Sequence, residues 1–378
     1  MYKKSAGDKI YDLAVVGAGP AGSLAAALAA KAGFSTVILE QKNFPRHKIC
    51  GGFISERSLS LLPEDLILPP EISNPVNTLT VTRGNKSSVY TSEKMLGLII
   101  KRELFDNYLA GYACNKGAVL FEGTALVGLE KEDVEKTGQF YYLLQIKNPL
   151  KSTLRARYVI GADGAYSRCG SLSGLRKKIN YRTGWGLAKF VEIESRPGKP
   201  GTLNFFPLPF LGGMGWSFNG PGWVNQGVGG LANRSLLLKA YRRLFPEDKE
   251  YVNLPVWPLP FLGPLAKAAA GNLLLVGDAA GLIEPFSGEG LCNTFKSAIL
   301  SVQALIRAES ENKTAATIYQ GSFNKIFRKN FTADLAGAAL LHVRSIISPS
   351  SLPQLMAALM EDKLWFNRDF KISTLTGR

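Results

Sequence analysis

Three glycines near the start of the chain carry the first chemical signal, because Gly17, Gly19 and Gly22 are spaced as G-x-G-x-x-G. The apolar run 13–16 before them predicts a strand, and the alanine-rich segment 23–32 after them predicts a helix. In such a unit the first glycine makes a tight turn, the second lets the backbone approach a pyrophosphate, and the third lets helix and strand pack closely. The spacing therefore predicts a dinucleotide-binding site.

An acidic residue at the right distance strengthens this prediction. Glu40 ends a second apolar segment, "STVILE", and follows Gly22 by 18 residues. In a dinucleotide site such an acid accepts hydrogen bonds from the ribose hydroxyls, while amides at the helix N-terminus face the phosphates. A secretory signal peptide is the other interpretation of an apolar stretch behind two lysines, but it needs neither the glycine register nor the acid. We expect this stretch to be the centre of a nucleotide site.

The composition is that of a globular chain without a metal site. The chain has 378 residues, of which 46% are hydrophobic and 20% charged, enough for a large core in two interwoven lobes. Its four cysteines are scattered without a C-x-x-C pair, which argues against zinc and against a disulfide framework and fits a reducing cytoplasm. No apolar run reaches the ~18 residues of a membrane span. We expect a cytoplasmic protein.

The charge balance is strongly basic. Lysine and arginine exceed aspartate and glutamate by 45 to 30, which gives a net charge of +15 and attracts anions in general. The basic residues are spread along the chain and no nucleic-acid-binding signature accompanies them, so we expect no nucleic-acid partner. Peripheral contact with the inner, anionic face of a membrane is one explanation of the excess, and simple solubility is another.

Two further glycine–aspartate turns follow apolar runs far downstream. Asp163 lies in "VIGADGAYS" and Asp278 in "LLVGDAAGL", and a nicotinamide-dependent dehydrogenase needs neither turn. With three such turns in this order, the chain resembles the FAD-dependent oxidoreductases built on the p-hydroxybenzoate hydroxylase plan. The resemblance implies that Asp278 binds the ribityl chain of FAD. It also implies that the turn 285–291 places backbone N–H groups against flavin N1 and O2, where negative charge develops on reduction.

Two more motifs narrow the resemblance to the geranylgeranyl reductase family. The loop 44–52, "FPRHKICGG", carries the K-x-C-G-G pattern that this family places over the flavin. Residues 213–231 resemble the family's Y-x-W-x-F-P and N-x-G-x-G motifs. Met214 and Asn219 depart from the first motif, where the family has tyrosine and proline, and both lie on the segment implied to face the substrate. The resemblance covers residues 9–330.

The resemblance also implies cofactor contacts along all of these segments. Arg46 is expected at the pyrophosphate. Arg102 begins an R-x-x-x-D pattern with Asp106 and is expected either at the FAD phosphates or in an i,i+4 ion pair on a helix surface. The other expected cofactor-binding residues are Gly17, Gly19, Pro20, Ala21, Gly22, Glu40, Gln41, Cys50, Gly51, Ala125, Asp163, Gly164, Gly277, Asp278, Gly288, Gly290, Leu291 and Cys292.

Two titratable residues of the loop 44–52 are candidate catalytic acids. Cys50 lies in the part of the loop implied to cover the flavin, and an unperturbed thiol is mostly protonated at neutral pH and able to donate a proton. Burial as a small hydrophobic residue is the alternative for Cys50. His47 is the second candidate, and exposure to solvent is its alternative.

Aromatic residues are frequent between positions 205 and 261 and are candidates for the wall of an apolar substrate site. The family motif selects Trp216 and Phe218, and Phe206 is expected beside them. A sheet core is the alternative for most of this group. The remaining members of the group are Phe205, Phe210, Trp223, Trp257 and Phe261.

The predicted fold is α/β, with a doubly wound, Rossmann-like FAD-binding domain, an interwoven β-sheet substrate domain and a helical C-terminal tail. A helix is expected at 101–115, strands at 118–130 and 140–147, and helices after 288. The FAD-binding domain is expected to be discontinuous, with 1–75, 98–180 and 268–330. The substrate domain takes 76–97 and 181–267, and the helical C-terminal segment takes 331–378.

The resemblance implies an enzyme that reduces carbon–carbon double bonds of a prenyl or isoprenoid substrate. Flavin N5 delivers a hydride to one alkene carbon and an acid, with Cys50 as first candidate, protonates the other. The electron donor is left open between NADPH and ferredoxin. One alternative is a flavin monooxygenase acting on an aromatic or polyene substrate, and the W-x-W-x-I-P signature of the related halogenases is missing. A non-catalytic FAD-binding protein is the second alternative.

Overall fold

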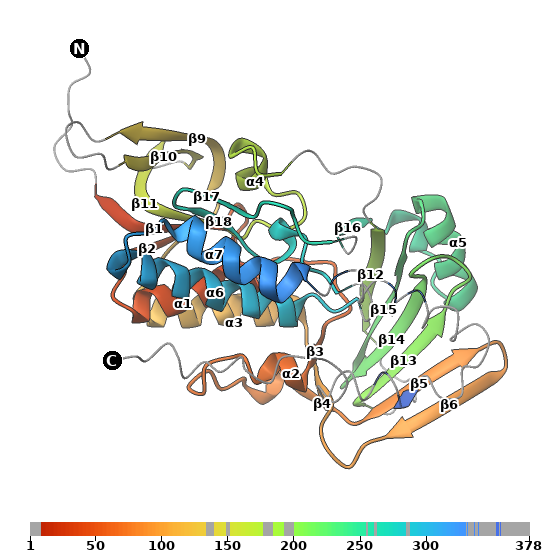
Figure 1. Ribbon diagram of the computed structural model, residues 1–378. Helices are drawn as coiled ribbons and strands as arrows, with labels where there is room; N and C mark the ends of the chain where they lie inside the picture. Colours follow the sequence, from red (N-terminus) through yellow and green to blue (C-terminus); the bar gives the residue numbers. More distant parts are fainter. Residues whose placement is uncertain are drawn as a thin grey trace.

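The computed structural model describes residues 9–133, 140–148, 152–176, 184–192, 200–254, 256–260, 263–284 and 288–329, and single positions beyond 329. In Figure 1 two sheets stand side by side: the first is covered by long helices, and the second, on the right, carries helix α5 on its outer side. A small third sheet lies between them.

The first sheet has a parallel centre. In the described part of the chain its eight strands include the path β17-β18-β11-β1-β2-β8, in which β18, β11, β1, β2 and β8 are parallel, while β9 and β10 extend from β11 as an antiparallel ribbon. The carboxyl ends of parallel strands meet at one edge of a sheet, where ligands of α/β proteins bind. The strands are β1 (Ile10–Val16), β2 (Thr36–Leu39), β8 (Val119–Phe121), β9 (Ala125–Asp133), β10 (Phe140–Lys147), β11 (Thr153–Gly161), β17 (Ala269–Ala270) and β18 (Leu273–Leu275).

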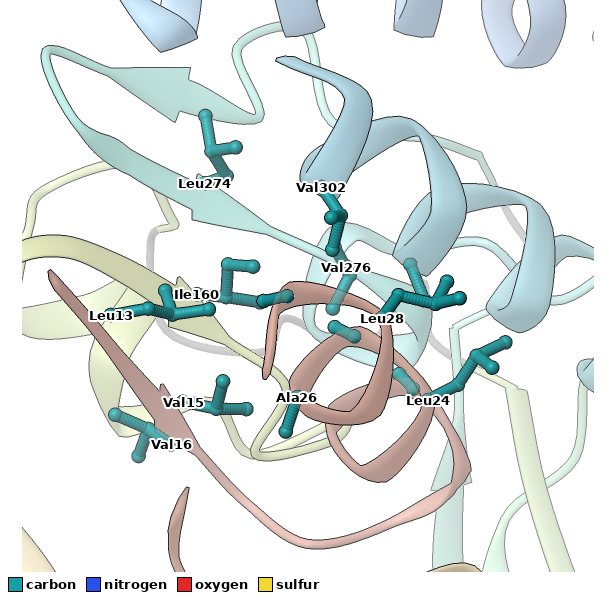
Figure 2. Packing of buried hydrophobic residues seen from close by; sticks show 14 of the residues in the cluster. Leu13, Val15, Val16, Leu24, Ala26, Leu28, Ile160, Leu274, Val276 and Val302 are labelled. Carbon is teal, nitrogen blue, oxygen red and sulfur yellow. The ribbon is translucent and has the colours of Figure 1, made fainter. Parts of the chain in front are cut away.

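Four longer helices pack together on one side of this sheet (Figure 1). Helix α1 begins after Gly19 with proline as its first residue, and its alanine side chains are buried, so neighbouring helices and strands can approach it closely. Figure 2 shows apolar side chains of β1, β11, β18, α1 and α6 meeting in one core, among them Leu13, Ile160, Leu274, Leu24 and Val302. The helices are α1 (Pro20–Lys31), α3 (Arg102–Asn115), α6 (Leu291–Ser310) and α7 (Ala315–Phe323), the last continued by a π turn at Asn324–Arg328.

The second sheet has seven strands in the described residues, in the order β16-β12-β15-β14-β13-β5-β6. Strands β5 and β6 come from the first half of the chain, and β5 pairs in parallel with β13. Helix α5 (Arg234–Leu244) covers one face through Leu237 and Tyr241. The strands are β5 (Thr78–Arg83), β6 (Lys86–Thr91), β12 (Gly184–Glu192), β13 (Thr202–Pro207), β14 (Met214–Gly220), β15 (Trp223–Gly230) and β16 (Trp257–Leu259).

The third sheet joins the two halves of the chain. Its order is β3-β7-β4, with all neighbours antiparallel. Strand β3 directly follows the loop 44–52, so pairing with β7 fixes where that loop ends. Two short helices complete the described elements near the site. These elements are β3 (Phe53–Ser55), β4 (Asn74–Val76), β7 (Gly97–Ile99), α2 (Glu56–Leu59) and α4 (Arg168–Leu172).

The predicted α/β class and nucleotide-binding unit are confirmed, and the helix expected at 101–115 is α3. The domain boundaries stay a prediction, although the strands of 76–97 do join those of 200–260 in the second sheet. Most of the expected helical segment 331–378 lies outside the described residues, as do Phe261 and positions 285–287.

Gly22 is the position at which a single methyl group should disturb this fold. A Cβ atom there would lie 1.9 Å from the Gly17 carbonyl oxygen, so the turn and α1 would have to separate. We expect Gly22→Ala to lower the free energy of unfolding by about 1–3 kcal/mol, the usual cost of overpacking. The measurement is thermal or urea unfolding of the protein without added cofactor.

Gly111→Ala in α3 is the matched control. A Cβ atom at Gly111 meets nothing within 4 Å, so this change should leave stability unchanged or raise it by about 0.5–1 kcal/mol, because alanine favours a helix over glycine. Equal losses in the two variants would contradict the assigned packing role of Gly22.

Candidate active site

The functional residues meet in one large cavity at the carboxyl edge of the parallel strands. The cavity has a volume of about 1340 Å³ and reaches from the ends of β1, β2 and β11 to the aromatic side chains of β14. All site residues predicted from the sequence line this cavity except four, which are Gly22, Gly277, Cys292 and Phe206. The structure therefore brings segments that are far apart in the sequence together around this cavity.

The glycine turn after β1 forms a cradle for a dinucleotide. Gly17 has a φ of +99°, and a Cβ atom there would lie 2.6 Å from the Ala162 carbonyl oxygen, so only glycine fits. The Cβ direction of Gly19 is open apart from an Arg46 guanidinium nitrogen 3.6 Å away. A negatively charged pyrophosphate fits this position, because it would meet the N-terminus of α1 and a cation.

Glu40 is held in place at the end of β2. Its carboxylate accepts hydrogen bonds from the backbone N–H groups of Ala18 and Lys42, both at 3.1 Å. A carboxylate has room for further donors, so ribose hydroxyls can still bind to it. The residues present thus fit the adenosine half of FAD.

A chain of alternating charges runs from Glu40 into the protein. Arg46 Nε lies 3.2 Å from Glu40 Oε2, and Arg46 Nη1 lies 3.1 Å from Asp106 Oδ2. Arg102 donates two hydrogen bonds to Asp106, at 2.8 and 3.0 Å. The Arg102–Asp106 pair is the expected i,i+4 pair, but it is buried, so the alternative of a surface pair was wrong. The sequence pattern did not show that the loop residue Arg46 would cover this pair.

The two aspartates of the downstream turns have different surroundings. Asp163 accepts hydrogen bonds from the Ser167 hydroxyl at 2.6 Å and the Cys169 N–H at 2.8 Å, so its carboxylate holds the start of α4. Burial raises the pKa of Asp163, although these two donors act to lower it. Asp278 lines the cavity near Gly290, whose Cβ direction passes 3.7 Å from Asp278 Oδ1. Asp278 is therefore the better placed of the two for a ribityl hydroxyl.

The loop over the cavity is fastened to the second sheet through Asn225. The Asn225 amide donates a hydrogen bond to the Cys50 carbonyl and accepts one from the Trp216 indole N–H, both at 2.8 Å. Asn225 is fully buried. The Gly52 N–H contacts the Cys50 sulfur at 3.4 Å, and the Gly52 carbonyl accepts from Ile100 N–H at 2.7 Å. The Cys50 thiol thus has a fixed position between the nucleotide edge and the aromatic strand.

The aromatic wall of the cavity follows one face of β14. Met214, Trp216 and Phe218 alternate along this strand, as side chains on one face of a strand do, and all three line the cavity. Phe206 does not join them, because it packs against Phe245 beneath α5 at a ring distance of 6.1 Å. Its neighbour Phe205 lines the cavity instead, since adjacent residues of a strand face opposite sides.

His47 and Cys50 are not equivalent candidates in the structure. The His47 side chain is 53% exposed, and its Nδ1 lies 3.4 Å from the Glu103 carboxylate on the surface of α3. Cys50 is partly buried and lies beside the Arg102 guanidinium. Because Cys50 is partly buried in the cavity and His47 is mostly exposed, the positions of the two side chains favour Cys50 as the acid.

Lys48 is a site residue that the sequence analysis did not assign. Its Nζ lies 4.2 Å from the centre of the Trp257 ring, in the same cavity. Burial lowers the pKa of Lys48, while the nearby Asp278 carboxylate acts to raise it. The K-x-C-G-G pattern contained this lysine, but only the fold shows that its side chain points into the site.

A buried ion-pair cluster includes Glu289, which lies in the turn implied to face the flavin. The sequence patterns did not predict this cluster. Arg57 bridges Glu284 at 2.8 Å and Glu289 at 3.0 Å, and Glu289 also accepts from the hydroxyls of Ser55 and Ser58. Burial acts to raise the pKa of Glu289, but Arg57 and the hydroxyls outweigh it and hold the pKa below its usual value. The cluster ties the residues beside Gly288 and Gly290 to α2.

Asp278→Ala should weaken FAD binding far more than Asp163→Ala. Loss of a carboxylate that accepts a ribityl hydroxyl should cost about 1.5–3 kcal/mol, or about 10- to 150-fold in affinity. Asp163→Ala should mainly lower the thermal stability, because Ser167 and Cys169 lose their acceptor. Titration of the protein with FAD and unfolding without FAD separate the two effects. Equal affinities for FAD would show that the two turns are assigned wrongly.

No group of residues suited to a metal ion, and no helix long and apolar enough to cross a membrane, is found in the described part of the chain.

Known proteins are similar to this chain in sequence and in fold. Residues 11–198 match the protein family described as FAD binding domain. Digeranylgeranylglycerophospholipid reductase 1 of Methanopyrus kandleri is 29% identical, over 94% of this chain and 99% of the relative. Digeranylgeranylglycerophospholipid reductase of Methanocella arvoryzae is 28% identical, over 85% of this chain and 84% of the relative.

The solved structures of similar fold include a geranylgeranyl bacteriochlorophyll reductase-like protein of Thermoplasma acidophilum, with a TM-score of 0.77, 22% identity, and coverage of 98% of this chain and 95% of that one. The flavin-dependent halogenase CmlS has a TM-score of 0.67 and 17% identity, with coverage of 97% and 76%. The nucleotide cradle, the cavity and the relatives agree that the chain is an FAD-dependent oxidoreductase, similar over most of its length to digeranylgeranylglycerophospholipid reductases.

Proposed function

We propose that this enzyme saturates carbon–carbon double bonds in the prenyl chains of a lipid. The observation that carries the proposal is the position of Cys50, which lies between the nucleotide edge and the apolar wall formed by Met214, Trp216 and Phe218. The wall suits a long hydrocarbon chain because it offers apolar area and few groups that would need a hydrogen bond. The names of the curated relatives support the same substrate class.

The residues of the chain divide the work between cofactor and substrate. Gly17, Gly19, Glu40 and Asp278 hold FAD, which when bound and reduced supplies the hydride for one alkene carbon. The Cys50 thiol donates its proton to the other carbon, so that one hydride and one proton saturate the double bond. The Cys50 sulfur then regains a proton from water.

Orientation is the main contribution of the protein, because an isolated alkene is a poor hydride acceptor. Holding the reacting groups together supplies much of the catalysis in such a case. Asn225 bonds to both Trp216 and the Cys50 carbonyl, so the aromatic wall and the proton donor share one anchor. The aromatic wall orients the prenyl chain, and the anchor keeps the thiol at a constant distance from it.

Peripheral contact with an anionic membrane is part of the proposal, because prenyl lipids reside in membranes. The net charge of +15 supports it. Such contact depends on charge, so it should weaken as ionic strength rises and the screening length falls to about 8 Å at 0.15 M.

Product analysis without oxygen tests the proposed reaction. The purified enzyme, with its flavin chemically reduced, should convert an unsaturated prenyl lipid to a more saturated product under anaerobic conditions. Because the reduction consumes only a hydride and a proton, oxygen should not be required. A product that forms only with oxygen would favour a monooxygenase, and no product under either condition would favour a non-catalytic flavoprotein. Mass spectrometry of the lipid distinguishes the three outcomes.

Cys50→Ser tests the proton donor. The variant should bind FAD and accept electrons almost normally, but its reduced flavin should be reoxidised by substrate ~10²-fold more slowly, the usual effect of losing a general acid. Anaerobic stopped-flow absorbance of the flavin gives this rate. Reoxidation at the normal rate would eliminate the thiol as the acid.

Asn225→Asp tests the position of the Cys50 thiol and is compared with Cys50→Ser. It keeps the thiol and can still accept the Trp216 N–H, but it loses the donor to the Cys50 carbonyl. A displaced thiol should slow the same step by up to ~10²-fold and also lower FAD affinity, because the loop over the cavity is loosened.

A role for Cys50 in packing alone predicts a different pattern. Cys50→Ala should then lower FAD affinity and stability less than Cys50→Ser does, because alanine buries no hydroxyl.

A further inference from the structure

We propose that helix α5 and the turn between β13 and β14 form the surface that contacts an anionic membrane, and that this surface adjoins the end of the substrate cavity. We call this surface the α5 face. It consists of the α5 residues Arg234, Leu236, Lys239, Arg242 and Arg243, with Leu211 and Val252. The inference rests on the proposed membrane contact and adds its location.

Helix α5 is amphipathic, and its outer side is basic. Leu237 and Tyr241 are fully buried against the second sheet, while the outer residues of the helix are exposed. The helix "RSLLLKAYRRL" contains four cations and no acid. A basic outer side on an amphipathic helix is the arrangement that anionic lipid headgroups attract. Figure 1 shows α5 on the outer side of the second sheet, away from the long helices of the first.

Acidic residues lie next to the helix but not on it. Glu247, Asp248 and Glu250 follow α5, and Asp248 is turned inward, since it accepts the Tyr241 hydroxyl at 2.9 Å. The exposed Arg242 lies over the Tyr251 ring at 6.0 Å. The positive charge of the α5 face is therefore concentrated on the helix itself.

Three large apolar side chains are exposed on the same surface. Leu236 is 40% exposed, Leu211 55% and Val252 49%. Leu236 belongs to α5, and hydrogen bonds tie the other two residues to its start: Leu211 O accepts from the backbone N–H of Leu231, three residues before α5, at 2.9 Å, and the Arg234 guanidinium donates to Val252 O at 2.7 Å. Apolar side chains among cations can enter the acyl boundary of a bilayer while the cations bind headgroups.

The α5 face adjoins the cavity through the turn that carries Leu211. Leu211, Gly213 and Leu231 line the cavity, and Met214, Trp216 and Phe218 continue the wall toward the Cys50 loop. The span of β14 from Met214 to Phe218 is about 13 Å, at about 3.3 Å per residue. A prenyl tail leaving the bilayer at Leu211 would meet an apolar wall all the way to the thiol. Membrane contact at this place would deliver the lipid to the site without exposing it to water.

Flotation with lipid vesicles tests the location. The FAD-loaded enzyme is mixed with vesicles of phosphatidylcholine alone or with phosphatidylserine added, at low and at physiological salt. The test variant carries Lys239→Gln, Arg242→Gln and Arg243→Gln. The control variant carries Lys31→Gln, Lys267→Gln and Lys325→Gln, three exposed lysines of the first sheet's helices and loops, and has the same net charge.

We expect the wild-type enzyme and the control variant to bind the anionic vesicles at low salt, and the α5 variant to bind about 10²-fold more weakly. Each cation near an anionic surface contributes about fivefold, equivalent to about 1 kcal/mol. Unfolding of all three proteins is measured in parallel, because Arg242 and Arg243 also lie at the helix C-terminus, where cations favour the helix.

The outcomes separate the location from the membrane contact itself. A wild-type enzyme that binds neither kind of vesicle would overturn both. Equal weakening of vesicle binding in the α5 variant and the control would support membrane contact but contradict its location on the α5 face. The net charge of the protein, and not the position of the cations, would then be responsible for binding. As a second measurement, Leu236→Ser, at an exposed residue of the α5 face that does not line the cavity, should slow reduction of vesicle-embedded lipid but not of a detergent-dispersed short prenyl substrate. Equal slowing of both would contradict membrane contact at the α5 face.

Discussion

The side-chain amide of Asn225 joins the two halves of the site. Its two hydrogen bonds, one in each direction, connect the loop that covers the nucleotide edge with the strand that forms the apolar wall. Because the amide is fully buried, a lost partner would leave a polar group unsatisfied at a cost of about 1–3 kcal/mol. The relative position of cofactor edge, thiol and substrate wall therefore depends on one amide that can both donate and accept.

Sequence patterns predicted the parts of the site that are local or that depend on strand ends. Gly17, Glu40, Asp163 and Asp278 each follow an apolar strand, and parallel strands bring their carboxyl ends to one edge. The family motifs added Cys50 and Trp216. The structure places these residues around one cavity because a short motif fixes the local backbone, and the topology of a parallel sheet then fixes where that motif lies.

The parts that were missed depend on contacts between segments distant in the sequence. No pattern shows that Arg46 covers the Arg102–Asp106 pair, because those residues are separated by about sixty positions and meet only after the loop folds over α3. Phe206 and Phe205 have the same chemistry, and only the register of β13 decides which of them faces the cavity. Lys48 was visible in its motif, but the direction of its side chain was not.

The pairing of β5 with β13 has a consequence for how the molecule can be divided. Strand β5 comes from the first quarter of the chain, yet it lies inside the sheet formed by residues 184–259, while β17 and β18, which follow that sheet in the sequence, complete the first one. The polypeptide thus crosses between the two sheets repeatedly. A fragment ending after β11 would lack two strands of its own sheet, β17 and β18, and expose the edge of another, so neither half could be expressed as an autonomous unit or exchanged between relatives as a module. Recombination between this chain and its relatives should therefore replace loops and surface helices rather than whole lobes.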